Sequence, residues 1–216
     1  MPFFDEIARQ SDQLIHFKSV STGEQVSFPA FINQFSDNYA VSWGAGPQIF
    51  GRTDPIKNYQ TTSRRIQATF DILGRNRQIA LENFQKYSKL IKMLYPVYED
   101  PRPGGNNSRI IKSAPLIRIR YSNYIRSEAN PDGLLGCLQG VTFAPDFAGG
   151  HFITQKNELI PVKYNMSLQF EPLHERPLGF DKNGEFLNKT FPYNQERMSV
   201  SRNPSTPGSA AVVTGR

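Results

Sequence analysis

Three stretches in which apolar and polar residues alternate strictly limit most sharply how this chain can fold. The stretches Arg65–Ile72 and Pro115–Tyr121 are two of them. In the third, the apolar positions are Val162, Tyr164, Met166, Leu168 and Phe170. Successive side chains of a strand point to opposite faces, so this period predicts three strands that each bury one face.

Further strands are predicted where β-branched and aromatic residues gather between turn residues. These are residues 25–32, 38–43 and 136–143, and a hairpin over residues 152–170 that turns at residues 155–158. A Gly-rich turn follows Trp43, and residues 99–108 have the composition of a loop.

One helix is predicted at residues 77–95, where the apolar period changes to 3.6 residues. Asn76 is a suitable N-cap, and Pro96 ends the run. The expected buried stripe is Ala80, Phe84, Tyr87, Ile91 and Leu94, widened by Leu81 and Leu90.

The predicted fold class is mainly β: an antiparallel β-sandwich or barrel with one flanking helix and extended terminal arms. We expect residues 1–24 to form an N-terminal arm or short helix, residues 25–180 the β domain, and residues 181–216 an extended C-terminal arm. The sixteen Pro and sixteen Gly residues are consistent with long loops, and the sixteen Phe and nine Tyr with a packed core.

The net charge of +6 is uneven, because residues 60–126 contain thirteen Lys or Arg and only four Asp or Glu. Such asymmetry favours nucleic acid, an acidic protein surface, or packing between unlike faces of identical subunits. We favour contacts between subunits, in which arginines pair with acidic groups of a neighbour. The candidate interface residues are Arg52, Arg64, Arg65, Arg118 and Arg120.

No motif predicts catalysis. The histidines His16, His151 and His174 lack metal-ligand spacing, no phosphate-binding loop follows a strand, and no Gly-x-Ser-x-Gly pentapeptide occurs. We therefore expect a non-enzymatic protein with no catalytic, cofactor-binding or metal site. No run approaches the ~20 apolar residues of a membrane span and no leader pattern is present, so we expect synthesis in the cytoplasm and no membrane partner.

The order of these elements resembles the tail-tube family of contractile injection systems and the related tube-initiator and baseplate proteins of contractile-tailed bacteriophages. The resemblance covers roughly residues 25–180. It rests on Trp43 before a Gly-rich break, Gly51–Pro55, Tyr59, the strand 65–71, the helix ending at Leu94-Tyr95-Pro96, the strand 115–119 and the alternation 162–170.

The resemblance implies a hexameric ring whose inner wall is a continuous β-barrel. It implies a structural protein of the virion, expected to be the tube-initiator or baseplate ring that joins the central hub to the tail tube. Its partners would be tube, hub and baseplate wedge proteins, with DNA passing through the lumen without specific binding.

Two other functions stay open at this point. A single-stranded nucleic-acid-binding β-barrel would use the basic stretch, and it would show salt-dependent binding to an oligonucleotide. A virion-associated cell-wall hydrolase would be revealed by zymography.

Overall fold

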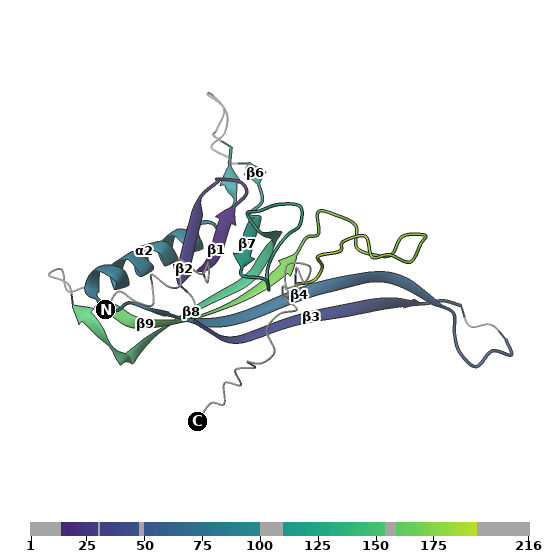
Figure 1. The fold of residues 1–216 in the computed structure, drawn as a ribbon, viewed down its shortest axis with the longest axis horizontal. Helices are drawn as coiled ribbons and strands as arrows, with labels where there is room; N and C mark the ends of the chain where they lie inside the picture. The colour runs from purple at the N-terminus through teal and green to yellow at the C-terminus, as the bar shows by residue number, and fades with distance from the viewer. Residues whose placement is uncertain (1–13, 30, 48–49, 100–109, 154–158, 194–216) are drawn as a thin grey trace, which may run out of the picture.

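The computed structural model describes residues 14–29, 31–47, 50–99, 110–153 and 159–193 of the 216-residue chain. The chain forms nine strands and one helix in this part (Figure 1). They are β1 (Leu14–Ser19), β2 (Gln25–Pro29), β3 (Phe31–Ala45), β4 (Lys57–Leu73), α2 (Arg77–Lys92), β5 (Val97–Tyr98), β6 (Ile111–Ser113), β7 (Ile117–Tyr121), β8 (Leu134–Ile153) and β9 (Leu159–Pro172).

Seven strands form one sheet in the order β2-β1-β7-β8-β9-β4-β3, and every neighbouring pair is antiparallel. The four strands β8, β9, β4 and β3 are long, whereas β7, β1 and β2 are short. In Figure 1 the short strands and α2 lie on the same side of the long strands. Strands β5 and β6 form a separate two-stranded sheet.

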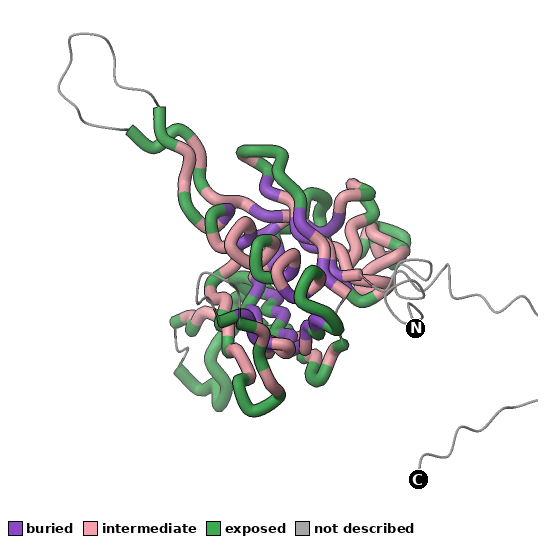
Figure 2. The backbone as a smooth tube through the Cα atoms, turned by 90° about the vertical axis from the view of Figure 1, so that its left-hand side faces the viewer, coloured by how far each residue is buried: buried purple, intermediate pink, exposed green. Residues whose placement is uncertain are grey.

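The core lies on the face of the long strands that α2 and the short strands cover. The buried rings of Phe17, Phe28, Phe70 and Phe170 come from β1, β2, β4 and β9, and they belong to one apolar cluster. In Figure 2 the buried segments lie in the middle of the molecule and the exposed ones project from it. The mainly β prediction with one flanking helix is therefore confirmed.

Helix α2 begins where its sequence signal places it. The side chain of Asn76 accepts a hydrogen bond of 2.8 Å from the backbone N–H of Ile79. Just before it, Gly74 lies so close to Ala80 that an added Cβ would be 2.6 Å from the Ala80 Cα. Glycine is therefore required for the tight turn from β4 into the helix.

The predicted buried stripe of α2 is wrong in part. Ala80 and Leu90 are fully buried as predicted, but Phe84 is 40% exposed. Asn83 is buried instead, and its side-chain amide donates a 3.3 Å hydrogen bond to the Leu73 carbonyl. A polar residue thus occupies the buried face because it satisfies a backbone acceptor at the end of β4.

Several strand predictions are corrected in extent. Residues 14–19, expected in an arm or short helix, form β1 between β2 and β7. Strands β3 and β4 are one long hairpin, in which the predicted segments 38–43 and 65–72 are only parts. The predicted turn 155–158 and residues 100–108 of the predicted loop lie outside the described residues. The division of the chain at residues 24 and 180 stays a prediction.

The corrected helix face predicts different costs for two truncations in α2. Leu90→Ala removes a fully buried side chain, so we expect it to lower the free energy of unfolding by about 2–5 kcal/mol. Phe84→Ala removes a partly exposed ring, and we expect a loss below about 1 kcal/mol. Urea denaturation of both variants would measure this, and equal losses would contradict the assigned face.

Candidate functional site

The β3–β4 hairpin extends beyond the core and forms an arm (Figure 1). We call residues 39–47 and 50–63 the hairpin arm; nearly all of its residues are exposed. Val41, Trp43 and Tyr59 are each more than half exposed, and the rings of Trp43 and Tyr59 contact edge to face. A strand pair that exposes large apolar side chains is a candidate contact surface for another protein.

A buried ion pair joins the two strands where the arm leaves the core. Arg64 donates from Nε to Oδ1 of Asp37 at 2.9 Å and from Nη2 to Oδ2 at 2.7 Å. Both side chains are only 3% exposed. This two-point geometry is the strong form of an arginine–carboxylate contact.

Two tyrosine hydroxyls also form hydrogen bonds with Asp37. The hydroxyls of Tyr39 and Tyr193 donate to its Oδ2 at 3.0 and 3.1 Å. Burial raises the pKa of Tyr39 above its ordinary value; the Arg64 guanidinium opposes this shift, and the Asp37 carboxylate adds to it. Tyr39 is therefore a neutral hydrogen-bond donor at physiological pH.

Residues 173–193, here called the crossing segment, pass over this ion pair. The Arg64 guanidinium lies 5.4 Å from the ring centroids of both Tyr39 and Phe191. The ring of Phe191 stacks on Phe186 and contacts His174 edge to face. The crossing segment thus contacts the hairpin through the Phe191 ring, which lies edge to face with Tyr39, and through the hydrogen bond from Tyr193 to Asp37.

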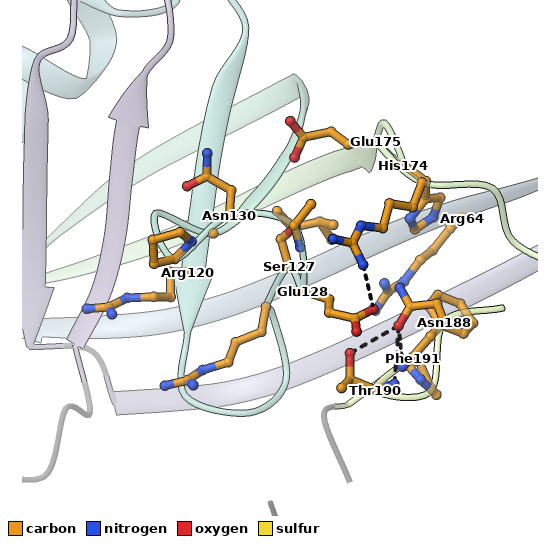
Figure 3. A pocket seen from close by; sticks show the side chains of 17 residues that line it. Arg64, Arg120, Ser127, Glu128, Asn130, His174, Glu175, Asn188, Thr190 and Phe191 are labelled. Atoms are coloured by element: carbon orange, nitrogen blue, oxygen red, sulfur yellow. Dashed lines mark hydrogen bonds and ion pairs between the residues drawn. The ribbon is translucent and has the colours of Figure 1, made fainter. Parts of the chain in front are cut away.

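A pocket of about 660 Å³ lies beside the crossing segment (Figure 3). Its walls come from the β7–β8 connection at residues 126–133, from residues 174–176 and from residues 188–192. The charged side chains of its lining, apart from a histidine, are Arg64, Arg120, Arg126, Arg176, Glu128 and Glu175. Four arginines and two carboxylates thus line the pocket.

The pocket wall is held by internal ion pairs. Arg118 donates to both carboxylate oxygens of Glu175 at 2.7 and 2.8 Å. This contact raises the pKa of Arg118 and lowers that of Glu175. Arg176 approaches Glu128 to 3.7 Å, and Arg120 contacts His16 at 3.1 Å.

The opposite face of the long strands is polar and open. Its cross-strand rows include Gln34, Thr69, Ser167 and Thr142, which stand side by side on β3, β4, β9 and β8. This face also has an ion pair, in which Lys163 lies 3.1 Å from Asp71. None of the described helices or strands covers this face in Figure 1.

Both edges of the long-strand sheet have unpaired lengths. Within the described residues, β3 pairs only with β4, and β8 pairs with β7 only over residues 134–136. The outer edges of β3 and of most of β8 therefore present backbone groups that another chain can pair with.

The predicted interface arginines have different surroundings. Arg64 and Arg118 are held by carboxylates of the same chain. Arg64 and Arg120 line the pocket. Arg65 is exposed on the open polar face, and Arg52 lies in the hairpin connection. An interface role for Arg52, Arg64, Arg65, Arg118 and Arg120 stays a prediction.

Sequence reasoning missed Asp37 and the crossing segment. Asp37 is 27 positions from Arg64, and only the β3–β4 register brings them together. Over the described ranges, no group of three or more His, Cys, Asp or Glu side chains is placed to hold a metal ion. The same ranges contain no helix long and apolar enough to cross a membrane.

Comparison with known proteins gives weak structural likenesses. No family model matches the chain, and no curated protein matches it. Among solved structures, the phage SPP1 Dit protein, a hub adsorption apparatus protein, has a TM-score of 0.38 and 10% identity over 76% of this chain and 51% of that chain. A chain of the anti-feeding prophage baseplate has a TM-score of 0.33 and 10% identity over 77% and 91%. This chain thus spans about half of the Dit chain, and scores this low decide nothing about its function.

The buried pair predicts a large loss when one partner is neutralised. Asp37→Asn leaves the Arg64 charge buried without its carboxylate, so we expect the free energy of unfolding to fall by about 3–5 kcal/mol. The control is Glu185→Gln, because Glu185 lies 4.0 Å from Lys189 in an exposed pair whose loss should cost less than about 1 kcal/mol. Urea denaturation measures the free energy of unfolding of both variants. Similar losses in the two would contradict the large contribution predicted for the buried pair.

Proposed function

We propose that this protein is a structural subunit of a bacteriophage tail, forming a hexameric tube-initiator or baseplate ring that joins the central hub to the tail tube. The observation that best supports this proposal is the pair of open edges on the long-strand sheet. The order of the sequence elements, which resembles the tail-tube family, supports the same assignment.

The strand directions suit closure into a ring. The sheet β8-β9-β4-β3 contains four antiparallel strands, so its two edge strands run in opposite directions. When β3 of one copy pairs with β8 of the next, the antiparallel pattern continues across the boundary. Such head-to-tail contacts close into a cyclic assembly and remove the exposed edges.

The open polar face is suited to the wall of a lumen. In a ring of this kind, α2 and the core would lie outside and the open face inside. Its rows of Gln, Ser and Thr offer hydrogen bonds, and its Lys163–Asp71 pair has no net charge to attract a polyanion. DNA would therefore pass without being held.

The nucleic-acid-binding alternative lacks support on this face. Single strands need stacking aromatic rings beside cations. In the rows from Gln34 to Asn38 on β3 and from Arg65 to Thr69 on β4, the open-face side chains are polar, and the exposed ring of Phe31 stands opposite Asp71. One ring is not a platform on which successive bases stack. The hydrolase alternative has no supporting observation in the described residues.

Ring closure through β3 can be tested with two neighbouring proline variants, Ala40→Pro and Val41→Pro. Backbone N–H groups of an edge strand point alternately toward and away from the partner strand. One variant should disrupt the β3–β4 pairing, and the other should remove only an outward N–H group. We expect the variant that removes only an outward N–H group to keep the wild-type melting temperature but to lose ring formation.

The measurements are light scattering and negative-stain images of each purified protein. The wild type should have a mass about six times that of the 24.5 kDa chain. A proline variant with disrupted assembly and an unchanged fold would support the proposal. Rings of normal mass from both variants, or a wild type without rings together with salt-dependent oligonucleotide binding, would contradict it.

A further inference from the structure

We propose that β3 of one copy pairs with β8 of the next copy in one register, in which Asn38 lies opposite Thr142 of the next copy. This inference rests on the proposed ring and assigns its contact residues. It follows from the direction of the backbone groups on the two edges, from the position of β7 and from the strand tilt that closure requires.

Hydrogen bonds inside the sheet decide which backbone groups of each edge point outward. Gly74 donates to the Val162 carbonyl at 2.7 Å, which fixes the hydrogen-bonded pairs between β4 and β9. In an antiparallel ladder these pairs alternate with pairs that have no hydrogen bond. Followed through the registers of the sheet, the outward groups belong to Phe35, Asp37, Tyr39 and Val41 on β3, and to Val141, Phe143 and Pro145 on β8.

Pro145 agrees with this assignment. A proline has no N–H group, so it fits a strand only where its backbone faces away from the neighbouring strand. Pro145 stands opposite Tyr164 of β9, and its missing donor therefore lies on the open edge of β8.

The outward residues of both edges also share one face of the sheet. Residues directly opposite each other point to the same face. Phe35 stands opposite the buried Ala68, and Val141 stands opposite the buried Leu168. The side chains of the outward residues are therefore on the core side. When outward residues pair across the boundary, the core face continues as core face and the open face as open face.

Strand β7 limits the register in one direction. It pairs with β8 over residues 134–136, so this part of the β8 edge is occupied within each copy. In the rows of the sheet, Gln34 is level with Thr142. If the next copy continued these rows, Ala40 would enter the stretch of β8 that β7 already holds. β3 must therefore be displaced away from β7.

A displacement of four positions places Asn38, instead of Gln34, opposite Thr142. Residues 34–40 of β3 then lie against residues 140–146 of β8. These two stretches have equal length, and each is regular in its own sheet. The register shift of β3 after Ser42 comes where β7 begins, so the hairpin arm can leave the edge at that point.

Closure of the sheet selects the same displacement. Strands of a barrel tilt by about 35–45° from the barrel axis, and this tilt requires a stagger. Four positions for each set of four long strands make the shear number equal to the number of strands. The eight-stranded barrel with a shear of eight has this ratio and a tilt of about 36°. A displacement of two positions would give about 20°, and six would give about 48°.

The side chains that meet in this register are compatible. On the core side, the partly exposed Tyr39 lies against Val141 of the next copy, while the Asp37 carboxylate stays directed at Arg64 of its own chain. No two like charges stand opposite each other. The remaining pairs are Phe35 with Pro145, Asp37 with Phe143, Gln34 with Asp146, Ser36 with Ala144, and Ala40 with Gly140.

A disulfide scan of the full-length chain tests the register. The background is Cys137→Ser, which removes the native thiol. Each variant adds Thr142→Cys and one further cysteine on β3. The four β3 substitutions are Gln34→Cys, Ser36→Cys, Asn38→Cys and Ala40→Cys, and all of these positions are exposed.

The scan reports only contacts between copies. Within one chain, β4 and β9 separate β3 from β8, so position 142 lies about 14 Å from the level position on β3. Two cysteines with Cα atoms more than about 7 Å apart do not form a disulfide without backbone movement. Every disulfide that forms therefore joins two chains.

We expect mild oxidation to link position 142 to position 38 at least about tenfold faster than to position 34, 36 or 40. Directly opposite Cα atoms are about 4.5–5.5 Å apart, whereas diagonal ones are about 7–8 Å apart. Non-reducing electrophoresis measures the rate, and light scattering of each reduced variant measures ring formation.

The outcomes separate the register from the ring itself. Rings that cross-link fastest at position 38 support the proposal. Rings that cross-link fastest at position 34, 36 or 40 would overturn the register and leave the ring in place. Rings that cross-link at none of the four positions would overturn the pairing of β3 with β8. Folded variants without rings and without cross-links would overturn both the register and the proposed function.

Discussion

The ion pair between Asp37 and Arg64 is the interaction on which the two parts of this molecule depend. The inward-facing series on β4 runs through Phe70, Ala68 and Ile66 and then reaches Arg64. At this point the apolar core ends, but the crossing segment still covers the strand. A buried guanidinium is stable there only because a carboxylate satisfies it from the neighbouring strand. The pair therefore holds β3 and β4 together at the point where the hairpin extends beyond the core.

The two faces of the long strands differ because they meet different surroundings. One face packs against α2 and the short strands, and it is apolar. The other is built of Gln, Ser and Thr and has no covering element among the described residues. A sheet with one solvated face is common in antiparallel proteins. What distinguishes this sheet is the length of its unpaired edges, since β3 alone has 15 residues. Long unpaired edges of this kind present backbone groups that a partner strand can bind.

The sequence allowed the strands with one buried face to be predicted, and it failed where both faces are polar. The alternation of β9 and of the inner half of β4 follows from the apolar core. The outer half of β4, residues 57–63, has no such period because neither face is buried. Its strand structure depends on backbone pairing with β3, which side-chain patterns do not report. Asn83 was missed for a related reason, because its burial depends on a carbonyl at the end of β4.

The uneven charge of the sequence is resolved in part inside the fold. Arg64, Lys89 and Arg118 belong to the basic stretch 60–126, and each lies near a carboxylate from outside it: Asp37, Glu24 and Glu175. Tertiary contacts between distant segments thus pair three of the thirteen cations of this stretch with carboxylates of the acidic remainder of the chain. Charge counted along the sequence therefore overstates the charge that the folded surface offers to a polyanion.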